Sequence, residues 1–115
     1  MDYTTEYYDR IWFMFESRIK AIKQRLLEEK IDAVFISSVA NIAYLSGFTN
    51  FSKDEREAYL LIGQDFGYII TDGRYSEAIK REVPHLKLFE RGNKKSIEEL
   101  FKKHKIKSLG IEEDN

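Results

Sequence analysis

The stretch Asn41-Ile-Ala-Tyr-Leu-Ser-Gly-Phe48 decides the fold of this chain. Ser38, just before it, can cap a helix because its hydroxyl accepts hydrogen bonds from the free N–H groups of a first helical turn. Gly47 can end that helix, because glycine adopts the left-handed backbone conformation without a Cβ penalty. We therefore predict a short helix over 39–46, closed by Gly47, with Phe48 packed in the core.

Around this helix, short apolar runs alternate with helical patterns. A long amphipathic helix is expected from Glu6 or Asp9 to Lys30, because apolar residues recur there at steps of three and four. Two runs joined by Gly63-Gln-Asp-Phe-Gly67 predict a β-hairpin. The predicted strands are 32–37, 57–62, 68–71, 86–90 and 108–112, and the later helices are 74–83 and one opened by a Ser96-x-x-Glu99 capping box. The pattern predicts an α/β fold: a mixed sheet of about five strands with one hairpin, flanked by helices.

Composition limits the classes of function. The 115 residues are enough for one domain with a core, and 43% of them are hydrophobic. With 19 basic and 20 acidic residues the net charge is −1, so no broad attraction to nucleic acid or anionic membrane is expected. There are no cysteines, which excludes disulfides and thiol nucleophiles. The start of the chain lacks the pattern of a signal peptide, and we expect a cytoplasmic protein.

Residues 1–14 form an aromatic-rich extension, and 15–115 form the domain proper. The extension and the first turn after it carry more aromatic side chains than one helical stripe can bury: Tyr3, Tyr7, Tyr8, Trp12, Phe13 and Phe15. Two interpretations stand equally: these rings cover a neighbouring subunit, or they cap the domain itself. The chain ends directly after its last predicted strand, so we expect a domain truncated at its C-terminus.

The sequence predicts no catalytic or metal-binding residue in this chain. A hydrolytic metal site needs carboxylates and usually histidine converging on one point. His85 falls in a connection, and His104 is expected to be an exposed residue at a helix end. We expect residues 112–114 to be a solvated acidic run and the lysines of 94–107 to lie on a solvated helix face.

Arg56 is the residue we single out for binding. Its planar guanidinium could hold a carboxylate through two hydrogen bonds. The alternative is that Arg56 forms an ion pair with one of its acidic neighbours. From the sequence alone, the ion pair is the preferred interpretation. Phe51, in the same loop, is expected to be exposed or at an interface. Asp72 is interpreted as the N-terminal cap of the helix that begins at Arg74.

Three motifs in this order resemble the N-terminal domain of the creatinase, prolidase and aminopeptidase P family. They are Asn41–Phe48, the Glu55-Arg56 pair before a strand, and Asp72-Gly-Arg-Tyr75 after the hairpin. The resemblance runs from about Phe15 to Glu112. It implies a ribonuclease H-like α/β topology without nuclease chemistry.

The resemblance also implies a role. In that family this domain mediates oligomers and places side chains at the rim of a partner subunit's active site. The candidates here are Arg56, Phe51, Phe48, Tyr44, Arg74 and Tyr75. A separate catalytic domain, absent from this chain, would carry two divalent metals, manganese or cobalt, and act on proline-containing peptides.

Two functional hypotheses follow. In the first, the chain is an accessory domain of an Xaa-Pro aminopeptidase or dipeptidase, and in the second it is a stand-alone α/β binding or scaffolding domain. A third and weaker hypothesis is that the parent enzyme is a creatinase-like amidinohydrolase. It is weaker because the Glu55-Arg56 and Asp72–Tyr75 motifs favour a peptidase.

Overall fold

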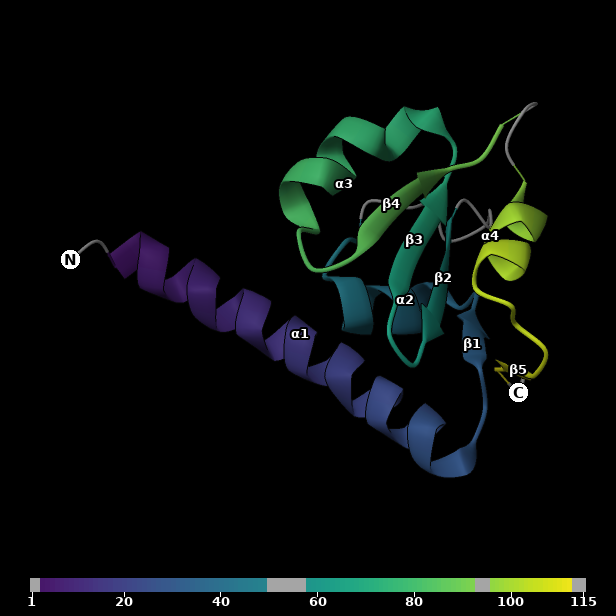
Figure 1. Ribbon diagram of the computed structural model, residues 1–115. Coiled ribbons are helices and arrows are strands. Elements are labelled where there is room, and N and C mark those ends of the chain that lie inside the picture. Colours follow the sequence, from purple (N-terminus) through teal and green to yellow (C-terminus); the bar gives the residue numbers. More distant parts are fainter. Residues whose placement is uncertain (1–2, 50–57, 93–95, 113–115) are drawn as a thin grey trace.

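The computed structural model describes residues 3–49, 58–92 and 96–112, with the side chains of the first helix described from Phe13 onward (Figure 1). Arg56 and Phe51, two of the predicted site residues, lie outside the described residues.

A five-stranded mixed sheet forms the centre of the fold, as the sequence predicted. Its strand order is β4-β3-β2-β1-β5. The β1–β2 and β2–β3 pairs are antiparallel, and the outer pairs β1–β5 and β3–β4 are parallel. The strands are β1 (Ala33–Ile36), β2 (Ala58–Gly63), β3 (Gly67–Thr71), β4 (Lys87–Glu90) and β5 (Leu109–Ile111). The predicted hairpin between β2 and β3 is confirmed, and the Gly63 N–H donates to the Phe66 carbonyl at 2.9 Å.

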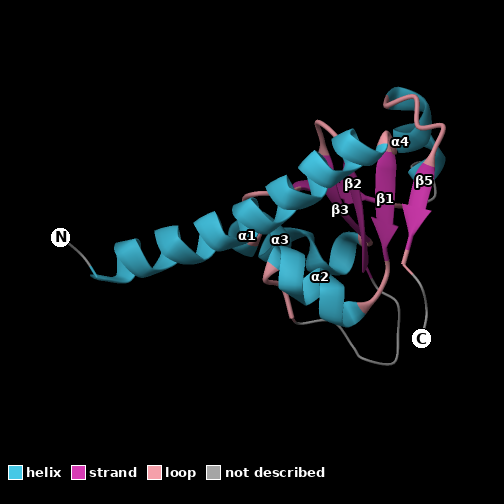
Figure 2. Cartoon of the chain, turned by 90° about the horizontal axis from the view of Figure 1, so that it is seen from below, coloured by secondary structure: helices cyan, strands magenta, loops and turns pink. Residues whose placement is uncertain are grey.

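Helices cover both faces of this sheet (Figure 2). Because side chains alternate along a strand, Leu60 and Ile62 of β2 face one layer and Leu61 faces the other. The first layer contains α1 (Tyr3–Glu29), α2 (Val39–Ser46) and α3 (Ser76–Glu82), and the second contains α4 (Ile97–Lys103). The core is therefore split into two clusters, one on each side of the sheet.

The long helix α1 contacts the domain mainly through its C-terminal half. Ile19 and Leu26 are buried in the first core layer, and Phe15 and Ile22 are half-buried beside them, as the predicted stripe requires. The helix begins at Tyr3, several residues before its predicted start. Its N-terminal turns extend beyond the body of the domain (Figure 1).

Two local predictions were wrong in detail. The segment predicted as one helix over 74–83 begins with a separate 3₁₀ turn, Gly73–Tyr75, before α3. Ser96 is the N-cap of α4, but its side chain makes no capping hydrogen bond, so the predicted capping box does not form. The backbone carbonyl of Ser96 instead accepts from the Glu99 N–H at 3.1 Å.

The predicted caps of α2 are both confirmed. The Ser38 hydroxyl accepts from the Asn41 N–H at 3.1 Å. Gly47 has φ 80°, and its N–H donates to the Ala43 carbonyl at 2.8 Å. Phe48 follows directly and is 2% exposed. The helix is thus fixed in length, and the turn at Gly47 directs the chain into the core.

We expect Gly47→Ala to destabilise the domain by about 1–2 kcal/mol, because alanine is strained at positive φ. A Cβ at this position would also lie 2.6 Å from Cε2 of the Phe15 ring, so that ring must move as well. Urea unfolding measures the cost. The control is Gly92→Ala, because a Cβ there meets nothing within 4 Å, and it should change stability by less than about 0.5 kcal/mol. Equal stability of the two variants would contradict the role of Gly47.

Candidate functional site

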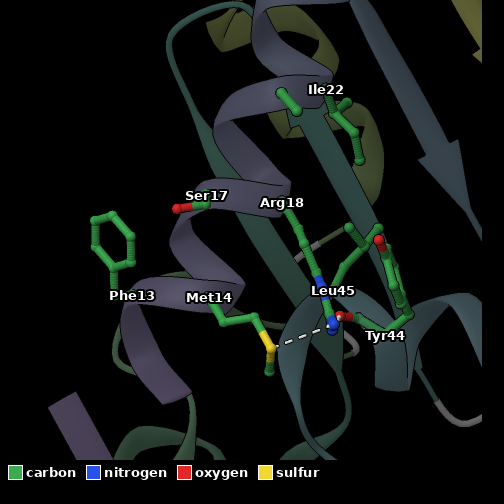
Figure 3. A pocket seen from close by; sticks show the side chains of 8 residues that line it. Phe13, Met14, Ser17, Arg18, Ile22, Tyr44 and Leu45 are labelled. Atoms are coloured by element: carbon green, nitrogen blue, oxygen red, sulfur yellow. Dashed lines mark hydrogen bonds between the residues drawn. The ribbon is translucent and has the colours of Figure 1, made fainter. Parts of the chain in front are cut away.

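A groove of about 630 Å³ runs between α1 and α2 (Figure 3). The Arg18 guanidinium lies 3.9 Å from the centre of the Tyr44 ring and donates to the Tyr44 carbonyl at 2.7 Å. A second guanidinium nitrogen contacts the Met14 sulfur at 3.3 Å. Tyr44 is 54% exposed, so the groove presents an aromatic ring stacked on a cation to the solvent. It can accept an apolar or aromatic side chain.

Phe48, which follows the Gly47 cap of α2, meets Tyr75 of the 3₁₀ turn. Their rings make an edge contact with centroids 6.1 Å apart. Phe48 is buried, as its place after the glycine cap predicts, and Tyr75 is half-buried. Of this pair, Tyr75 is therefore the residue with surface left to contact another molecule.

Asp72 and Arg74 form a rigid charged corner between β3 and α3. The Asp72 carboxylate accepts from the Arg74 backbone N–H at 3.0 Å, which confirms the predicted cap. Its two oxygens also accept from the guanidinium, at 3.0 Å from Nε and 2.8 Å from Nη2. Side-chain and backbone hydrogen bonds from Arg74 hold the pKa of Asp72 below its ordinary value. The corner therefore stays ionised and holds the guanidinium in place.

The structure thus divides the predicted site residues between two places. Tyr44 lies in the α1–α2 groove, whereas Phe48, Arg74 and Tyr75 lie around the corner before α3. At that corner Ala58, the first residue of β2, pairs with Thr71, the residue before Asp72.

A second hollow, of about 540 Å³, borders the same corner. It is lined by Asp72, Arg91, Gly92, Ser96, Ile97, Glu98 and Phe101. The Arg91 guanidinium lies 5.1 Å from the centre of the Tyr59 ring, on the α4 side of the sheet. Charges of both signs line this hollow, so it suits a polar group.

Glu112 has a structural role that the sequence did not predict. Its carboxylate accepts hydrogen bonds from the Ser37 and Ser38 backbone N–H groups, the latter at 2.9 Å, and from the Asn41 side chain. Glu112 is therefore not part of a solvated run, since it caps the N-terminus of α2 from the far end of β5. Its partners lie more than seventy residues away in the chain, and no local pattern signals such a contact.

A second carboxylate holds the other end of β5. Asp32 accepts from the Lys107 and Ser108 N–H groups at 2.8 and 3.1 Å, and its own N–H donates to the Ser108 hydroxyl at 2.8 Å. The backbone hydrogen bonds from Lys107 and Ser108 lower the pKa of Asp32. The short edge strand is thus fastened to β1 at both ends by side chains.

Both histidines pack inside aromatic contacts. His85 stacks on Phe15 with centroids 5.6 Å apart, its Nε2 lies 3.0 Å from the Leu45 carbonyl, and burial lowers its pKa. His104 stacks on Phe66 at 3.9 Å, and its Nε2 lies 2.8 Å from the Tyr68 hydroxyl. Burial lowers the pKa of His104 too, and the prediction of an exposed histidine was wrong. Its stacking partner, Phe66, lies in the turn between β2 and β3, so the residues next to His104 in the sequence do not predict the contact.

The described residues hold no group of three or more histidine, aspartate or glutamate side chains that could bind a metal ion. Across the same parts of the chain, no helix is long and apolar enough to cross a membrane. The described lysines of the predicted solvated face, such as Lys102 and Lys103 in α4, are exposed.

We expect Glu112→Gln to lower the melting temperature at pH 7. Burial raises the pKa of Glu112, but the hydrogen bonds from Asn41, Ser38 and Ser37 outweigh it, and the net pKa lies below the ordinary value of 4.5. A depressed pKa stabilises the fold above pH 4.5, and that stability is lost as the pH falls through the folded-state pKa. Thermal melts of parent and variant should therefore differ at pH 7 and converge in acid.

Glu82→Gln serves as the control for this experiment, because Glu82 is an exposed glutamate of α3. It should leave the melting temperature unchanged. A Glu112→Gln variant that melts with the parent at pH 7 would show that the carboxylate does not hold α2.

The mixed five-stranded sheet with helices on both faces defines an α/β domain. The sequence profile of the Creatinase/Prolidase N-terminal domain matches residues 18–115. The chain therefore belongs to the Creatinase/Prolidase N-terminal domain family. No protein of curated function matches its sequence.

Solved structures agree with this assignment. An Xaa-Pro aminopeptidase from Streptococcus pyogenes is 26% identical with a TM-score of 0.75, over 89% of this chain and 76% of that one. The N-terminal domain of the cytoplasmic peptidase PepQ from Mycobacterium tuberculosis is 26% identical with a TM-score of 0.66, over 84% and 72%. X-Pro aminopeptidase from Thermotoga maritima is 28% identical with a TM-score of 0.66, over 81% of this chain but only 26% of that one.

Proposed function

We propose that this chain is the non-catalytic N-terminal domain of an Xaa-Pro metallopeptidase, either an aminopeptidase or a dipeptidase. The observation that carries the proposal is the likeness to the Thermotoga maritima X-Pro aminopeptidase, in which this domain accounts for 26% of the chain. Most of that chain lies outside the match, which leaves room for a separate catalytic domain. In this proposal the chain contributes to oligomerisation and to the rim of a partner subunit's substrate pocket.

The corner before α3 supports the rim role. Arg74 is held by Asp72 in one orientation, and Tyr75 keeps part of its ring at the surface. Strand β2 begins beside this corner, and Arg56 precedes β2 by two residues in the sequence. A guanidinium from that segment could bind the terminal carboxylate of a short peptide through two hydrogen bonds. Such a contact would set the length of the substrate without taking part in bond chemistry.

The chemistry belongs to the catalytic half in this proposal. Two divalent metals, manganese or cobalt, would be held there and would activate water for hydrolysis of the bond next to proline. The described residues of this chain do not fit such a site, and none is assigned to it. We also place the parent enzyme in the cytoplasm.

The alternative is a stand-alone binding or scaffolding domain with the same fold. The reading frame downstream of Asn115 separates the two hypotheses. A further domain with aspartate, histidine and glutamate ligands favours the peptidase, whereas an early stop codon favours the stand-alone domain.

We expect no Xaa-Pro peptidase activity from the 115-residue chain alone, because the ligand set that would hold catalytic metals is not predicted in it. The assay incubates the pure chain with added manganese and an Xaa-Pro dipeptide or a longer peptide with proline second. The longer parent protein is the positive control. Turnover by the chain above the buffer rate would contradict the assignment of chemistry to the other half.

We expect Arg56→Ala in the longer parent to raise KM for short peptides more than it lowers kcat, because the lost contact binds the substrate and does no chemistry. Steady-state kinetics with peptides of different length measure the split. Arg25→Ala is the control, since Arg25 is an exposed arginine paired with Glu29 on α1. Unchanged kinetics for Arg56→Ala would mean that Arg56 forms only a surface ion pair.

A further inference from the structure

His85 contacts two helices from the connection between α3 and β4. Its half-buried ring stacks on Phe15 of α1, with the centroids 5.6 Å apart and the ring planes within 10° of parallel. Its Nε2 lies 3.0 Å from the carbonyl oxygen of Leu45 in the last turn of α2. Both helices cover the same face of the sheet (Figure 2). One imidazole therefore joins α1, α2 and the segment that follows α3.

The contact with Leu45 satisfies one of the carbonyls that a helix leaves free at its C-terminus. The carbonyls of residues 43–45 accept hydrogen bonds from the Gly47 N–H, the Arg18 guanidinium and His85, in that order. Two of these three donors come from outside the helix. The last turn of α2 is therefore held partly by side chains of α1 and of the connection before β4.

The same contact determines which nitrogen of His85 carries the hydrogen. A carbonyl oxygen only accepts, so the neutral ring has its hydrogen on Nε2 and a lone pair on Nδ1. Nδ1 is buried and makes no hydrogen bond to any of the described residues. A second proton would bind there and create a buried N–H donor without an acceptor. Because such a donor is costly, this environment suits the neutral ring and disfavours the charged one.

The titration of His85 follows from this environment. Burial lowers its pKa below the ordinary value of 6.5, although the hydrogen bond to Leu45 and the charge of the exposed Glu16 act in the opposite direction. The neutral ring therefore stabilises the fold in full above pH 6.5, and that stability is lost as the pH falls from 6.5 through the folded-state pKa. The loss begins at a higher pH than for the carboxylates described above, whose ordinary pKa values are 4.5 and 3.8.

Other charged side chains lie on the elements packed around His85. The Arg18 guanidinium of α1 lies 5.4 Å from the centre of the Phe15 ring, so protonation of His85 would place two positive charges around one ring. Helix α2 has no charged side chain. The charged residues of α3 and β4 that are nearest in sequence are exposed: Arg81, Glu82 and Lys87.

We propose that His85 is a pH-sensitive switch: the neutral ring holds the last turn of α2 against α1, and protonation in mild acid releases that turn. The release also loosens the α1–α2 groove, because Arg18 binds the carbonyl next to the one that His85 binds. The Phe15 ring, which lies against both His85 and Gly47, loses one of its two neighbours. This switch goes beyond the proposed function and requires no peptidase activity.

The first experiment measures the tautomer and the titration of His85 in the unmodified chain. NMR of labelled histidine resolves its rings, since the chain has only two histidines, and His104→Gln assigns them. We expect the neutral His85 ring to carry its proton on Nε2 and to titrate with a midpoint below 6.5. A proton on Nδ1, or a midpoint at or above 6.5, would overturn the proposal.

The second experiment measures the release of the helix end by hydrogen exchange. We expect the protection factor of the Gly47 N–H to fall at least about fivefold from about pH 7.5 to about pH 5, the effect of one unpaired buried donor. His85→Gln offers the Leu45 carbonyl an amide donor that does not titrate, so this fall should disappear. His104→Gln is the matched control and should keep the response of the parent.

Three results would overturn the switch. The first is a Gly47 protection factor that does not fall in the parent, and the second is the same fall in His85→Gln as in the parent. The third is loss of the whole sheet at about pH 5, seen as amides of β2 and β3 no better protected than Gly47, because the release would then not be local. If His85→Gln fails to fold, the tautomer and midpoint of the unmodified chain still test the proposal.

Discussion

The rest of this structure depends on how α2 is held at its two ends. At the N-terminus the Ser38 hydroxyl and the Glu112 carboxylate satisfy backbone N–H groups that a helix leaves free. At the C-terminus Gly47 takes a left-handed conformation directly against the Phe15 ring, where a Cβ would not fit. An eight-residue helix has little stability of its own, so these contacts and its buried face determine whether it forms.

Fixing α2 fixes both surfaces that we consider functional. Tyr44, on its outer face, stacks with Arg18 and makes one wall of the groove with α1. Phe48, after its last turn, reaches Tyr75 in the corner before α3. The same short helix therefore connects the groove beside α1 to the corner beside β2. A substitution at Gly47 or Glu112 that moves α2 would therefore change both the α1–α2 groove and the corner before α3.

Three carboxylates of the described residues accept hydrogen bonds from backbone N–H groups. Asp32 and Glu112 hold the two ends of the edge strand β5, and Asp72 caps the 3₁₀ turn before α3. Each has a lowered pKa because its hydrogen bonds favour the ionised form. Acid therefore weakens several connections of the sheet together, whereas no catalytic acid or base is needed to explain any of these shifts.

The sequence by itself determined the element order, the two caps of α2, the hairpin and the burial of Phe48, because each depends on residues close together in the chain. The sequence also indicated the family, through three short motifs in a fixed order. Only the tertiary structure decided that Glu112 caps α2, that His104 stacks on Phe66, and that Tyr44 pairs with Arg18. These contacts join segments that are far apart in sequence, and their partners are set by strand pairing and helix packing rather than by any local pattern. For the same reason Ser96 matched a capping box that the folded chain does not use.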